Sequence, residues 1–522
     1  MILVWLLITP ALGAIAAWLL GARNPAWPRW VSLAAMAAEM GIAVYLGVRW
    51  GMLGLSPGGP WLEELNAPWI PQLGIGFHLA LDGLSLLMVA LTAFLGLLSI
   101  ASSWNQIRER VGFFHFNLLW MLAGITGVFL AIDLILFYFF WEMMLVPSYL
   151  LFYWGHERRF QAAVKFFLFT QISGLLMLLA ILGLYFAHGQ ATGVFTFDFQ
   201  QLIGTRLPQP LALWLMLGFL AAFAVKLPVV PVHTWQPDAY VQSPTALTII
   251  LAGAMSKTGG YGLIRFLLPL FPSAAADFAI FALALAAASI LYGALLAYGQ
   301  RDLKRLLAYS SFGHMGFVLL GVFAATDLSL QGAVLFMLAH GVTTGSLFAL
   351  LGALQERTGT REMGRLGGLW ATVPRLGGVT LLFALSAMGL PGLGNFVGEF
   401  LVLVGTFQVD VAMAVAAAAG IVASAIYALW FIQRTFQGPN ERGWVLSDLL
   451  PREAAAMAAS AAAIVWLGLY PQPVIDTFAQ SLANLRQQVG PVGTEPVPGA
   501  VSHSASEGAL IAPGLRLTGG AP

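Results

Sequence analysis

Long apolar runs alternate with short polar segments along almost the whole chain. A helix needs about 20 apolar residues to cross a bilayer, and most of the runs have this length. They predict about fourteen membrane-spanning helices, near residues 2–21, 29–50, 79–102, 112–131, 133–154, 163–187, 211–235, 245–270, 276–299, 303–325, 331–353, 372–408, 411–435 and 454–471. The pattern is typical of an all-α integral membrane protein.

Two of the predicted spans, the seventh and the twelfth, are interrupted by proline. Pro228 interrupts the span near 211–235, and Pro391 interrupts the span near 372–408. Proline breaks a helix, and irregular backbone at membrane depth is tolerated only beside protein or a water-filled cavity. We therefore expect two broken helices. Their offset of five helices, an odd number, predicts two units of opposite orientation, as in transporters built from inverted repeats.

Basic residues are distributed unequally between the two sets of alternate loops. One set holds most of them, for example Arg158, Arg159, Arg301 and Lys304. The other set holds only Arg49, Arg206, Arg265, Arg486 and Arg516. By the positive-inside rule the first set is cytoplasmic. Both termini then lie on the outer side of the membrane, and their being on one side fits an even number of helices.

The composition supports the membrane assignment and excludes several kinds of binding site. The chain is 59% hydrophobic and only 9% charged, whereas soluble domains carry about 25% charged residues. Its net charge of +1 argues against nucleic acid as a partner. The absence of cysteine excludes cysteine-ligated zinc and iron–sulfur sites. No P-loop, dinucleotide fingerprint or metal-ligand spacing occurs, so we expect no cofactor, metal or redox chemistry in this chain itself.

Four charged residues draw attention because they lie deep inside predicted spans: Glu142, Lys226, Lys257 and Glu399. A charge at mid-bilayer costs roughly 2.5–3.5 kcal/mol on insertion scales, and such residues usually face an interior pathway. How firmly a buried lysine holds its proton depends on nearby carboxylates, which suits a proton relay. We expect Glu142 to be the partner of Lys226. The alternative is a set of static ion pairs that fix helix packing.

Two histidines lie in the tenth and eleventh predicted spans, His314 and His340. Imidazole titrates near neutral pH and has two nitrogens, so it can pass a proton on. Ser310, Thr343 and Thr344 add hydroxyl groups nearby. The alternative is that each histidine is simply hydrogen-bonded to a backbone carbonyl or a hydroxyl.

The polar loop between the seventh and eighth spans and the C-terminal tail allow less definite interpretations. His233 and Asp238 in the loop could take up protons on the cytoplasmic side, or the loop could be a turn, since Pro237 and Asp238 are turn residues. Residues 481–522 are rich in Pro, Gly and Ser, which predicts a disordered tail on the outer side.

Several long motifs occur in an order that resembles a known family. FWEMMLVPSYLL, KLPVVPVHTWQPDAYVQSPT, SKTGGYGLIRF, QRDLKRLLAYSSFGHMG and LPGLGNFVGEF resemble the proton-translocating, antiporter-like membrane subunits of respiratory complex I (NADH:quinone oxidoreductase). The resemblance covers about residues 1–480. It is specific for the superfamily, and within it the resemblance is to the M type of subunit, the chain-four type of mitochondria. This choice rests mainly on Glu399: the L and N types and the subunits of sodium/proton antiporters generally carry lysine there.

The resemblance implies a fold of fourteen helices in which helices four to eight and nine to thirteen form inverted five-helix repeats. The corresponding divisions are residues 1–110 for the first three helices, 111–270 for the first repeat, 271–436 for the second repeat, 437–480 for the last helix and 481–522 for the tail.

The resemblance also implies a role for each intramembrane residue. Glu142 and Lys226 would be a modulating pair, Lys257 the central relay, His314 and His340 connectors, and Glu399 the terminal group toward the outside. The sequence departs from the usual loop pattern at Gln236 and Tyr240, where apolar and often histidine residues are common. The resemblance alone therefore assigns no proton-uptake role to His233 and Asp238.

The function so predicted is that of a proton-translocating subunit of NADH:quinone oxidoreductase, a translocase without redox catalysis of its own. NADH, FMN, iron–sulfur clusters and quinone would bind to partner subunits, and L-type and N-type subunits would flank this chain. It would be a multi-pass protein of the bacterial inner membrane with both termini periplasmic. The alternatives are a subunit of a sodium/proton antiporter or of a membrane-bound hydrogenase complex.

Overall fold

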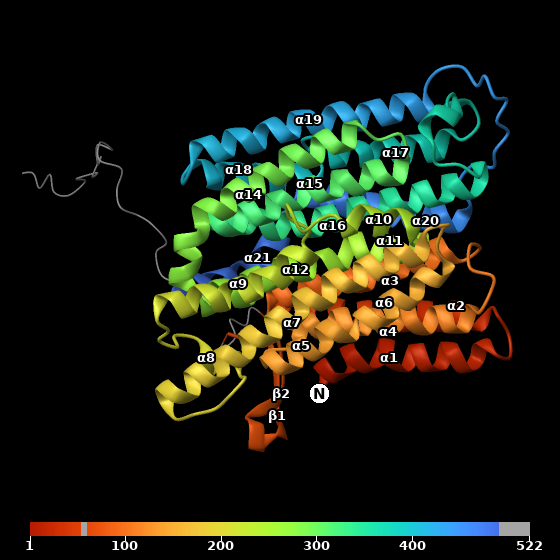
Figure 1. The fold of residues 1–522 in the computed structure, drawn as a ribbon. Coiled ribbons are helices and arrows are strands. Elements are labelled where there is room, and N and C mark those ends of the chain that lie inside the picture. Colours follow the sequence, from red (N-terminus) through yellow and green to blue (C-terminus); the bar gives the residue numbers. More distant parts are fainter. Residues whose placement is uncertain (54–59, 490–522) are drawn as a thin grey trace, which may run out of the picture.

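The computed structural model describes residues 1–53 and 60–489, and helices dominate these ranges (Figure 1). In this part of the chain, twelve helices are long and apolar enough to cross a membrane. The prediction of an all-α integral membrane protein is thereby confirmed. The number of fourteen spans stays a prediction, because the run from Thr245 to Leu270 and the halves of the second broken helix are not among the twelve.

The N-terminal part consists of three long helices and a β-hairpin that the sequence analysis did not predict. Its elements are α1 (Ile2–Gly21), α2 (Trp27–Leu53), β1 (Glu63–Ile70), the short turn η1 (Pro71–Leu73), β2 (Ile75–Leu81) and α3 (Gly83–Ser103). The two strands pair antiparallel. Asp82 ends the hairpin and begins α3, because its carboxylate accepts a hydrogen bond from the Ser85 amide at 2.9 Å.

The middle of the chain contains the first broken helix. Its elements are α4 (Val111–Leu130), α5 (Leu134–Met143), α6 (Leu145–Leu151), η2 (Phe152–Trp154), α7 (Arg159–Thr192), α8 (Phe199–Leu202), α9 (Gln209–Lys226), α10 (Trp235–Gln242), α11 (Thr245–Ile250), η3 (Leu251–Met255), α12 (Ser256–Gly262), η4 (Leu263–Leu267) and α13 (Leu268–Leu270). The span predicted near 245–270 is thus helical throughout, but η3 and η4 are π-helical turns. Such turns are rare and often occur at functional sites.

The last part contains the second broken helix. Its elements are α14 (Pro272–Tyr298), α15 (Leu303–Ala324), α16 (Asp327–Thr358), η5 (Met363–Arg365), η6 (Leu369–Ala371), α17 (Pro374–Ala387), α18 (Gly394–Phe407), α19 (Val411–Phe436), α20 (Pro451–Leu469) and α21 (Gln472–Val489).

Both predicted helix breaks are present. The first separates α9 from α10 and contains Pro228, and the second separates α17 from α18 and contains Pro391. The second break also needs glycine, because Gly389 and Gly392 have φ of +75° and +92°. In Figure 1 the chain runs rightward from α9 to α10 and leftward from α17 to α18. Opposite directions are what an inverted pair requires; the five-helix repeats themselves stay a prediction.

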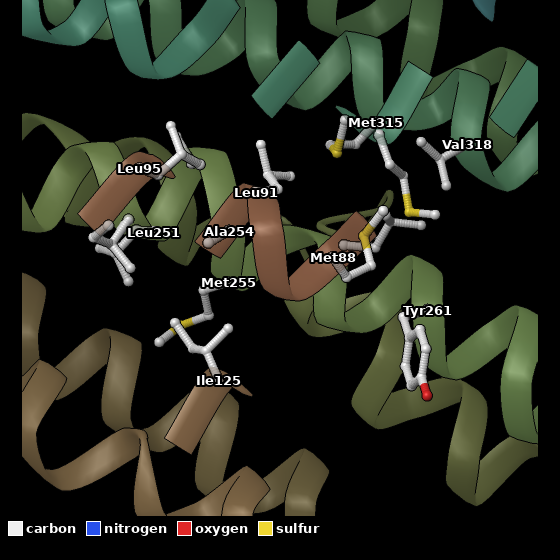
Figure 2. Close-up of a cluster of buried hydrophobic side chains, with 14 of the residues drawn as sticks. Met88, Leu91, Leu95, Ile125, Leu251, Ala254, Met255, Tyr261, Met315 and Val318 are labelled. Atoms are coloured by element: carbon white, nitrogen blue, oxygen red, sulfur yellow. The ribbon is translucent and has the colours of Figure 1, made fainter. Parts of the chain in front are cut away.

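The core joins helices that are far apart in the sequence. Figure 2 shows one buried cluster, to which α3 contributes Met88 and Leu95, α4 contributes Ile125, and α15 contributes Met315. Met255 lies in the same cluster and ends the π-helical turn η3. The segment 245–270 is therefore enclosed by other helices, which keeps its polar side chains away from lipid.

The prediction of disorder from residue 481 onward is wrong for residues 481–489, which are the end of helix α21. The remainder of that predicted tail lies outside the described residues. Helix α21 is amphipathic: Val474, Phe478, Leu482 and Leu485 are buried, and their spacing places them on one face of a helix. Pro, Gly and Ser are frequent only after residue 490, so the composition of the whole tail concealed this apolar period.

Candidate functional site

The first carboxylate, Glu142, lies in the last turn of α5 beside a glycine of the neighbouring helix. Asp133 is the N-cap of α5, since its carboxylate accepts hydrogen bonds from the amides of Ile135 and Leu136 at 2.9 and 3.1 Å. At the other end, a Cβ atom on Gly174 of α7 would collide with the Glu142 Oε1 atom. That oxygen is buried without a hydrogen-bond partner. The glycine therefore leaves room for a carboxylate whose bonding capacity is not exhausted.

Lys226 ends α9 immediately before the first helix break, and its surroundings are largely apolar. It is only 1% exposed. Its Nζ atom lies 3.5 Å from the Met255 sulfur and 5.5 and 5.6 Å from the ring centres of Trp141 and Phe166. Glu142 and Lys226 are near enough to interact electrostatically, but within the described residues they form no ion pair within 4.0 Å. The expected partners are neighbours and not a contact pair.

Lys257 lies between the two π-helical turns and is fully buried. Its Nζ atom donates to the Ala252 carbonyl at 2.7 Å and to the Ser256 hydroxyl at 3.1 Å. It also lies 2.8 Å from Nδ1 of His340 on α16. The backbones of α16 and η3 are in close contact at this point, because a Cβ atom on Gly341 would lie 2.9 Å from the Gly253 carbonyl oxygen. The close approach of α16 to η3 is what brings lysine and histidine together.

A polar line continues from His340 to helix α19. The rings of His340 and His314 are 5.8 Å apart between centres. The Tyr427 hydroxyl lies 3.4 Å from His314 Nε2 and 2.9 Å from the Ser310 hydroxyl. The structure thus joins both predicted histidines to Lys257. Tyr427 was missed, because an apolar helix with one tyrosine gives no sign of which distant side chain it faces.

The second carboxylate, Glu399, lies on α18 just after the second helix break. It is 2% exposed, and its Oε2 atom has no hydrogen-bond partner. A Cβ atom on Gly389 would lie 2.5 Å from this oxygen. Tyr427 is near enough to interact with it electrostatically. Glu399 and Glu142 therefore have one arrangement in common, a buried carboxylate oxygen against a glycine, although the Glu142 side chain as a whole is only partly buried.

A second polar residue near the second helix break also has free bonding capacity. Asn395 accepts a hydrogen bond from the Thr343 hydroxyl at 3.1 Å, and Thr343 lies 2.9 Å from the Ser386 hydroxyl. The amide nitrogen of Asn395 has no partner. The surroundings of the second break are thus rich in hydroxyl and amide groups.

The two loop residues proposed for proton uptake lie in different surroundings. Asp238 accepts from Lys165 at 2.8 Å and from Arg305 at 3.1 Å, and it lines a polar cavity of about 830 Å³. His233 is buried and stacks on Phe312 with 4.3 Å between ring centres. It does not line that cavity. The structure therefore brings only Asp238 to a polar opening.

The interpretation of Pro237 and Asp238 as turn residues is wrong, because both lie in helix α10, which two neighbours of Asp238 hold in place. Gln236 donates to the Ala308 carbonyl at 2.9 Å, and Tyr240 donates to the Leu251 carbonyl at 3.1 Å. Gln236 and Tyr240 therefore tie α10 to α15 and to the π-helical turn η3. Such a tie holds α10 beside the segment that carries Lys257.

Two further titratable residues, His156 and Lys304, lie at or near the polar cavity. From the sequence, Lys304 was considered only as one of the basic residues that indicate the cytoplasmic side. Lys304 is 1% exposed and donates to the Ser243 carbonyl at 3.1 Å. His156 lines the cavity. Burial, together with the positive charges of Lys304 and Arg361, lowers the pKa of His156 to about 3. At neutral pH this imidazole is therefore uncharged. Asp302 is the N-cap of α15, so Lys304 lies in the first turn of that helix and not in a loop.

The region offers no arrangement suited to a metal ion. Across residues 1–53 and 60–489, no three His, Asp or Glu side chains come together as metal ligands. Its chemistry is that of proton-binding groups: carboxylates, amines, imidazoles and hydroxyls.

Comparison with known proteins places these residues in a family. Residues 131–426 match the profile of the family described as NADH:quinone oxidoreductase/Mrp antiporter membrane proteins. The chain is 49% identical over 500 residues to NADH-quinone oxidoreductase subunit M of Pseudomonas aeruginosa, covering 94% of this chain and 98% of the relative. It is 46% identical over 499 residues to the Escherichia coli protein of the same name, covering 93% and 98%.

A solved structure agrees over nearly the whole chain. A chain of respiratory complex I from Thermus thermophilus with bound NADH superposes with a TM-score of 0.83 at 33% identity, covering 94% of this chain and 100% of that chain. The matched family region contains all six residues proposed for proton transfer: Glu142, Lys226, Lys257, His314, His340 and Glu399.

Proposed function

The chain belongs to the NADH:quinone oxidoreductase/Mrp antiporter membrane family, and from this premise we propose that it is the proton-translocating M-type subunit of a respiratory NADH:quinone oxidoreductase. It is a multi-pass protein of the bacterial inner membrane, and the basic loops assign both termini to the periplasmic side.

One observation carries the proposal: a buried polar line begins at Lys257 and continues through His340 and His314 to Tyr427. Each member can bind or release a proton, and the line crosses from the first half of the chain to the second. A mere spacer between other subunits would not need such a line, because burying polar groups costs free energy that packing alone does not require.

In the first half, Glu142 controls how firmly Lys226 holds its proton. An ammonium group in apolar surroundings is stabilised mainly by a nearby negative charge. Sulfur and aromatic rings are the nearest neighbours of Lys226, and Glu142 supplies the negative charge from outside contact distance. Displacing or neutralising Glu142 favours loss of the proton, which passes toward Lys257.

In the second half, a proton on Lys257 moves outward along the histidines. Lys257 donates toward His340 Nδ1, so that imidazole can accept the proton on one nitrogen and release another from its second nitrogen. His314 and Tyr427 continue the transfer to Glu399, the terminal group. The unsatisfied Oε2 atom of Glu399 is ready to accept it.

The redox chemistry takes place in partners. NADH, FMN, iron–sulfur clusters and quinone bind to other subunits of the complex, and L-type and N-type antiporter-like subunits flank this chain in the membrane arm. The chain then responds to their reaction by changing the distance or the charge at Glu142 and Lys226.

Replacement of either residue of the modulating pair tests the proposal. In vesicles that contain the assembled complex, Glu142→Gln or Lys226→Ala should abolish proton pumping coupled to quinone reduction while the complex still assembles. Glu109→Gln, a change of an exposed carboxylate, is the matched control and should pump normally. Normal coupled quinone reduction in the Glu142 or Lys226 variant would refute the assigned roles.

The family description also includes Mrp antiporters, which favours a sodium/proton antiporter subunit as the second candidate. The membrane-bound hydrogenases are a further possible parent complex. Sodium-dependent transport by membranes that do not oxidise NADH would support the antiporter, and co-purifying hydrogenase subunits would support the hydrogenase. Nicotinamide-dependent peripheral subunits in the purified complex would exclude both.

A further inference from the structure

A second set of buried polar side chains lies between helices α2 and α4, apart from the line described above and before the matched family region begins at residue 131. It comprises Ser32 and Glu39 on α2 and His115 and Thr126 on α4, each with 0% exposure. Glu39 is a further carboxylate inside a predicted span, the one near 29–50, and the sequence analysis gave it no role.

Glu39 has hydrogen-bonding capacity but no counter-charge. The Thr126 hydroxyl donates to its Oε1 atom at 2.7 Å, and its Oε2 atom has no partner. In the described part of the chain, no Lys, Arg or His nitrogen lies within 4.0 Å of this carboxylate. An isolated carboxylate is strongly disfavoured in an apolar interior and becomes neutral by binding a proton.

His115 and Ser32 repeat this lack of partners. Neither ring nitrogen of His115 has a hydrogen-bond partner, and neither has the Ser32 hydroxyl. A neutral imidazole carries one N–H donor and one acceptor, so His115 can accept a proton on one nitrogen while it releases one from the other. Packing does not explain these residues, because an apolar side chain would fill the same space without unpaired polar atoms.

We call the contact between α2 and α4 the seam, and neighbouring contacts show how the two helices run along it. Ala35 and Leu119 both lie against Gly13, and Met36 and Leu122 both lie against Gly96. Farther along, Thr126 contacts Glu39, so the residue numbers rise together from 35 to 39 on α2 and from 119 to 126 on α4, and the two helices run in the same direction.

The geometry of a helix then aligns the side chains along this contact. Ser32 and Glu39 are seven residues apart on α2, and His115 and Thr126 are eleven apart on α4. Because a helix has about 3.6 residues per turn, each pair shares one face. At about 1.5 Å per residue the seam is about 16 Å long.

The charged groups around the seam lie at one end. Arg29, at the start of α2, donates to the Ile107 carbonyl at 2.9 Å and is near enough to His115 to interact with it electrostatically. Arg452 lies beyond it, over the ring of Trp104. Helices α1 and α3, which also pack against α2, contain no Asp, Glu, Lys, Arg or His. The Arg29 end is thus the polar end, and Glu39 lies at the inner end.

We propose that Glu39 is a second proton-binding site, which holds a proton in the assembled protein and exchanges it through His115 at the Arg29 end of the seam. The proton reaches an imidazole nitrogen of His115, leaves from the other nitrogen, and passes Ser32 on its way to the Oε2 atom of Glu39. This site does not depend on the pumping line from Lys257 to Glu399, and it can exist whether or not that line pumps.

Infrared absorption of the purified complex at neutral pH tests the first part. A protonated carboxylic acid has a carbonyl band that a carboxylate lacks. The difference spectrum between the wild type and Glu39→Gln should contain one such band, and Glu39→Asp should keep a band at a shifted position. Glutamine is neutral and has the same shape, so this variant should assemble. If the difference spectrum shows carboxylate bands and no carboxylic acid band, the protonated state is disproved.

Transfer of the complex into deuterated buffer tests the route. The Glu39 band shifts when its proton is replaced by deuterium, and His115→Leu should slow this shift at least about tenfold because the leucine cannot relay a proton. His188→Asn is the matched control: His188 is bonded to Thr205 and lies on α7, outside the seam. Equal exchange rates in the wild type and His115→Leu would overturn the route through His115.

Discussion

The two helix breaks carry the same kind of residue, a buried titratable group, in opposite surroundings. Lys226 beside the first break is surrounded by the sulfur of Met255 and the rings of Trp141 and Phe166. Glu399 beside the second break lies near Tyr427, and its helix also carries the amide of Asn395. In apolar surroundings a charge depends on one distant partner, whereas polar groups can share a proton among several neighbours. The first break is therefore suited to control and the second to conduction.

Apart from replacement of the modulating pair, removal of the titratable group at the second break should have the largest effect. Glu399→Gln keeps the shape of the side chain but cannot bind and release a proton, so proton translocation should fall about 100-fold, the order of magnitude of acid–base assistance. Proton uptake by vesicles that contain the complex is the measurement. Glu441→Gln, a change of an exposed loop carboxylate, is the control. Near-normal translocation by Glu399→Gln would remove the second break from the proton path.

Gly174→Ala should have the next largest effect and tests whether the position of Glu142 matters at the first break. The added methyl group collides with Oε1 of Glu142 and must displace the carboxylate relative to Lys226. We expect about a tenfold loss of coupled pumping, corresponding to about 1.4 kcal/mol. Gly378→Ala is the control, because a Cβ atom there meets nothing within 4 Å. Equal rates in both variants would contradict control by the position of Glu142.

Tyr427→Phe should have a smaller effect and tests the conducting character of the second break. The change removes the hydroxyl near His314 and Ser310 and leaves the ring. A severalfold decrease in translocation is expected, since other hydroxyl groups remain nearby. Tyr470→Phe, at a tyrosine that is 61% exposed, controls for the loss of a hydroxyl elsewhere. A wild-type rate for Tyr427→Phe would show that the line does not pass through this hydroxyl.

The smallest effect is expected at the β-hairpin, where two carboxylates hold a histidine outside the membrane-spanning helices. His78 lies 2.5 Å from Asp198 and 2.8 Å from Glu64. Burial alone would lower the pKa of His78, but the hydrogen bonds and charges of Asp198 and Glu64 raise it above its ordinary value. Because the pKa is raised in the folded state, the stabilisation is complete below the unfolded value of about 6.5 and is lost as pH rises through the folded value.

Amide hydrogen exchange in the hairpin, corrected for the intrinsic effect of pH, measures this pairing. Protection of the amides of β1 and β2 should decrease by about 1 kcal/mol between about pH 6 and about pH 9. His78→Asn should abolish the pH dependence, whereas His188→Asn should leave it intact. If amide protection in the wild type does not change with pH, the pairing of a charged His78 with Asp198 and Glu64 is contradicted.

The apolar pattern predicted much of the fold because it acts locally. The length of each apolar run predicted the membrane-spanning helices, and Pro228 and Pro391 predicted both breaks. The pattern failed where the reason for a structure is not local. The strands β1 and β2 stabilise one another, and the period of α21 was obscured by the composition of the residues that follow it.

The candidate site could likewise be predicted from the sequence only in part. The six residues Glu142, Lys226, Lys257, His314, His340 and Glu399 could be chosen from the sequence, because a charged or imidazole side chain in an apolar run is expensive wherever it points. Their roles in proton transfer stay proposals. The sequence also paired Glu142 with Lys226, but it could not say that they lie near one another without contact.

The sequence by itself therefore determined which residues are costly to bury and where the helices break, since both depend on the chemistry of a single residue and its neighbours along the chain. Only the tertiary structure decided which helices face each other. It placed Tyr427 beside His314, Gly174 against Glu142, and Thr126 against Glu39. The physical reason is that a helix presents its side chains in every direction, and packing between helices selects which of them meet.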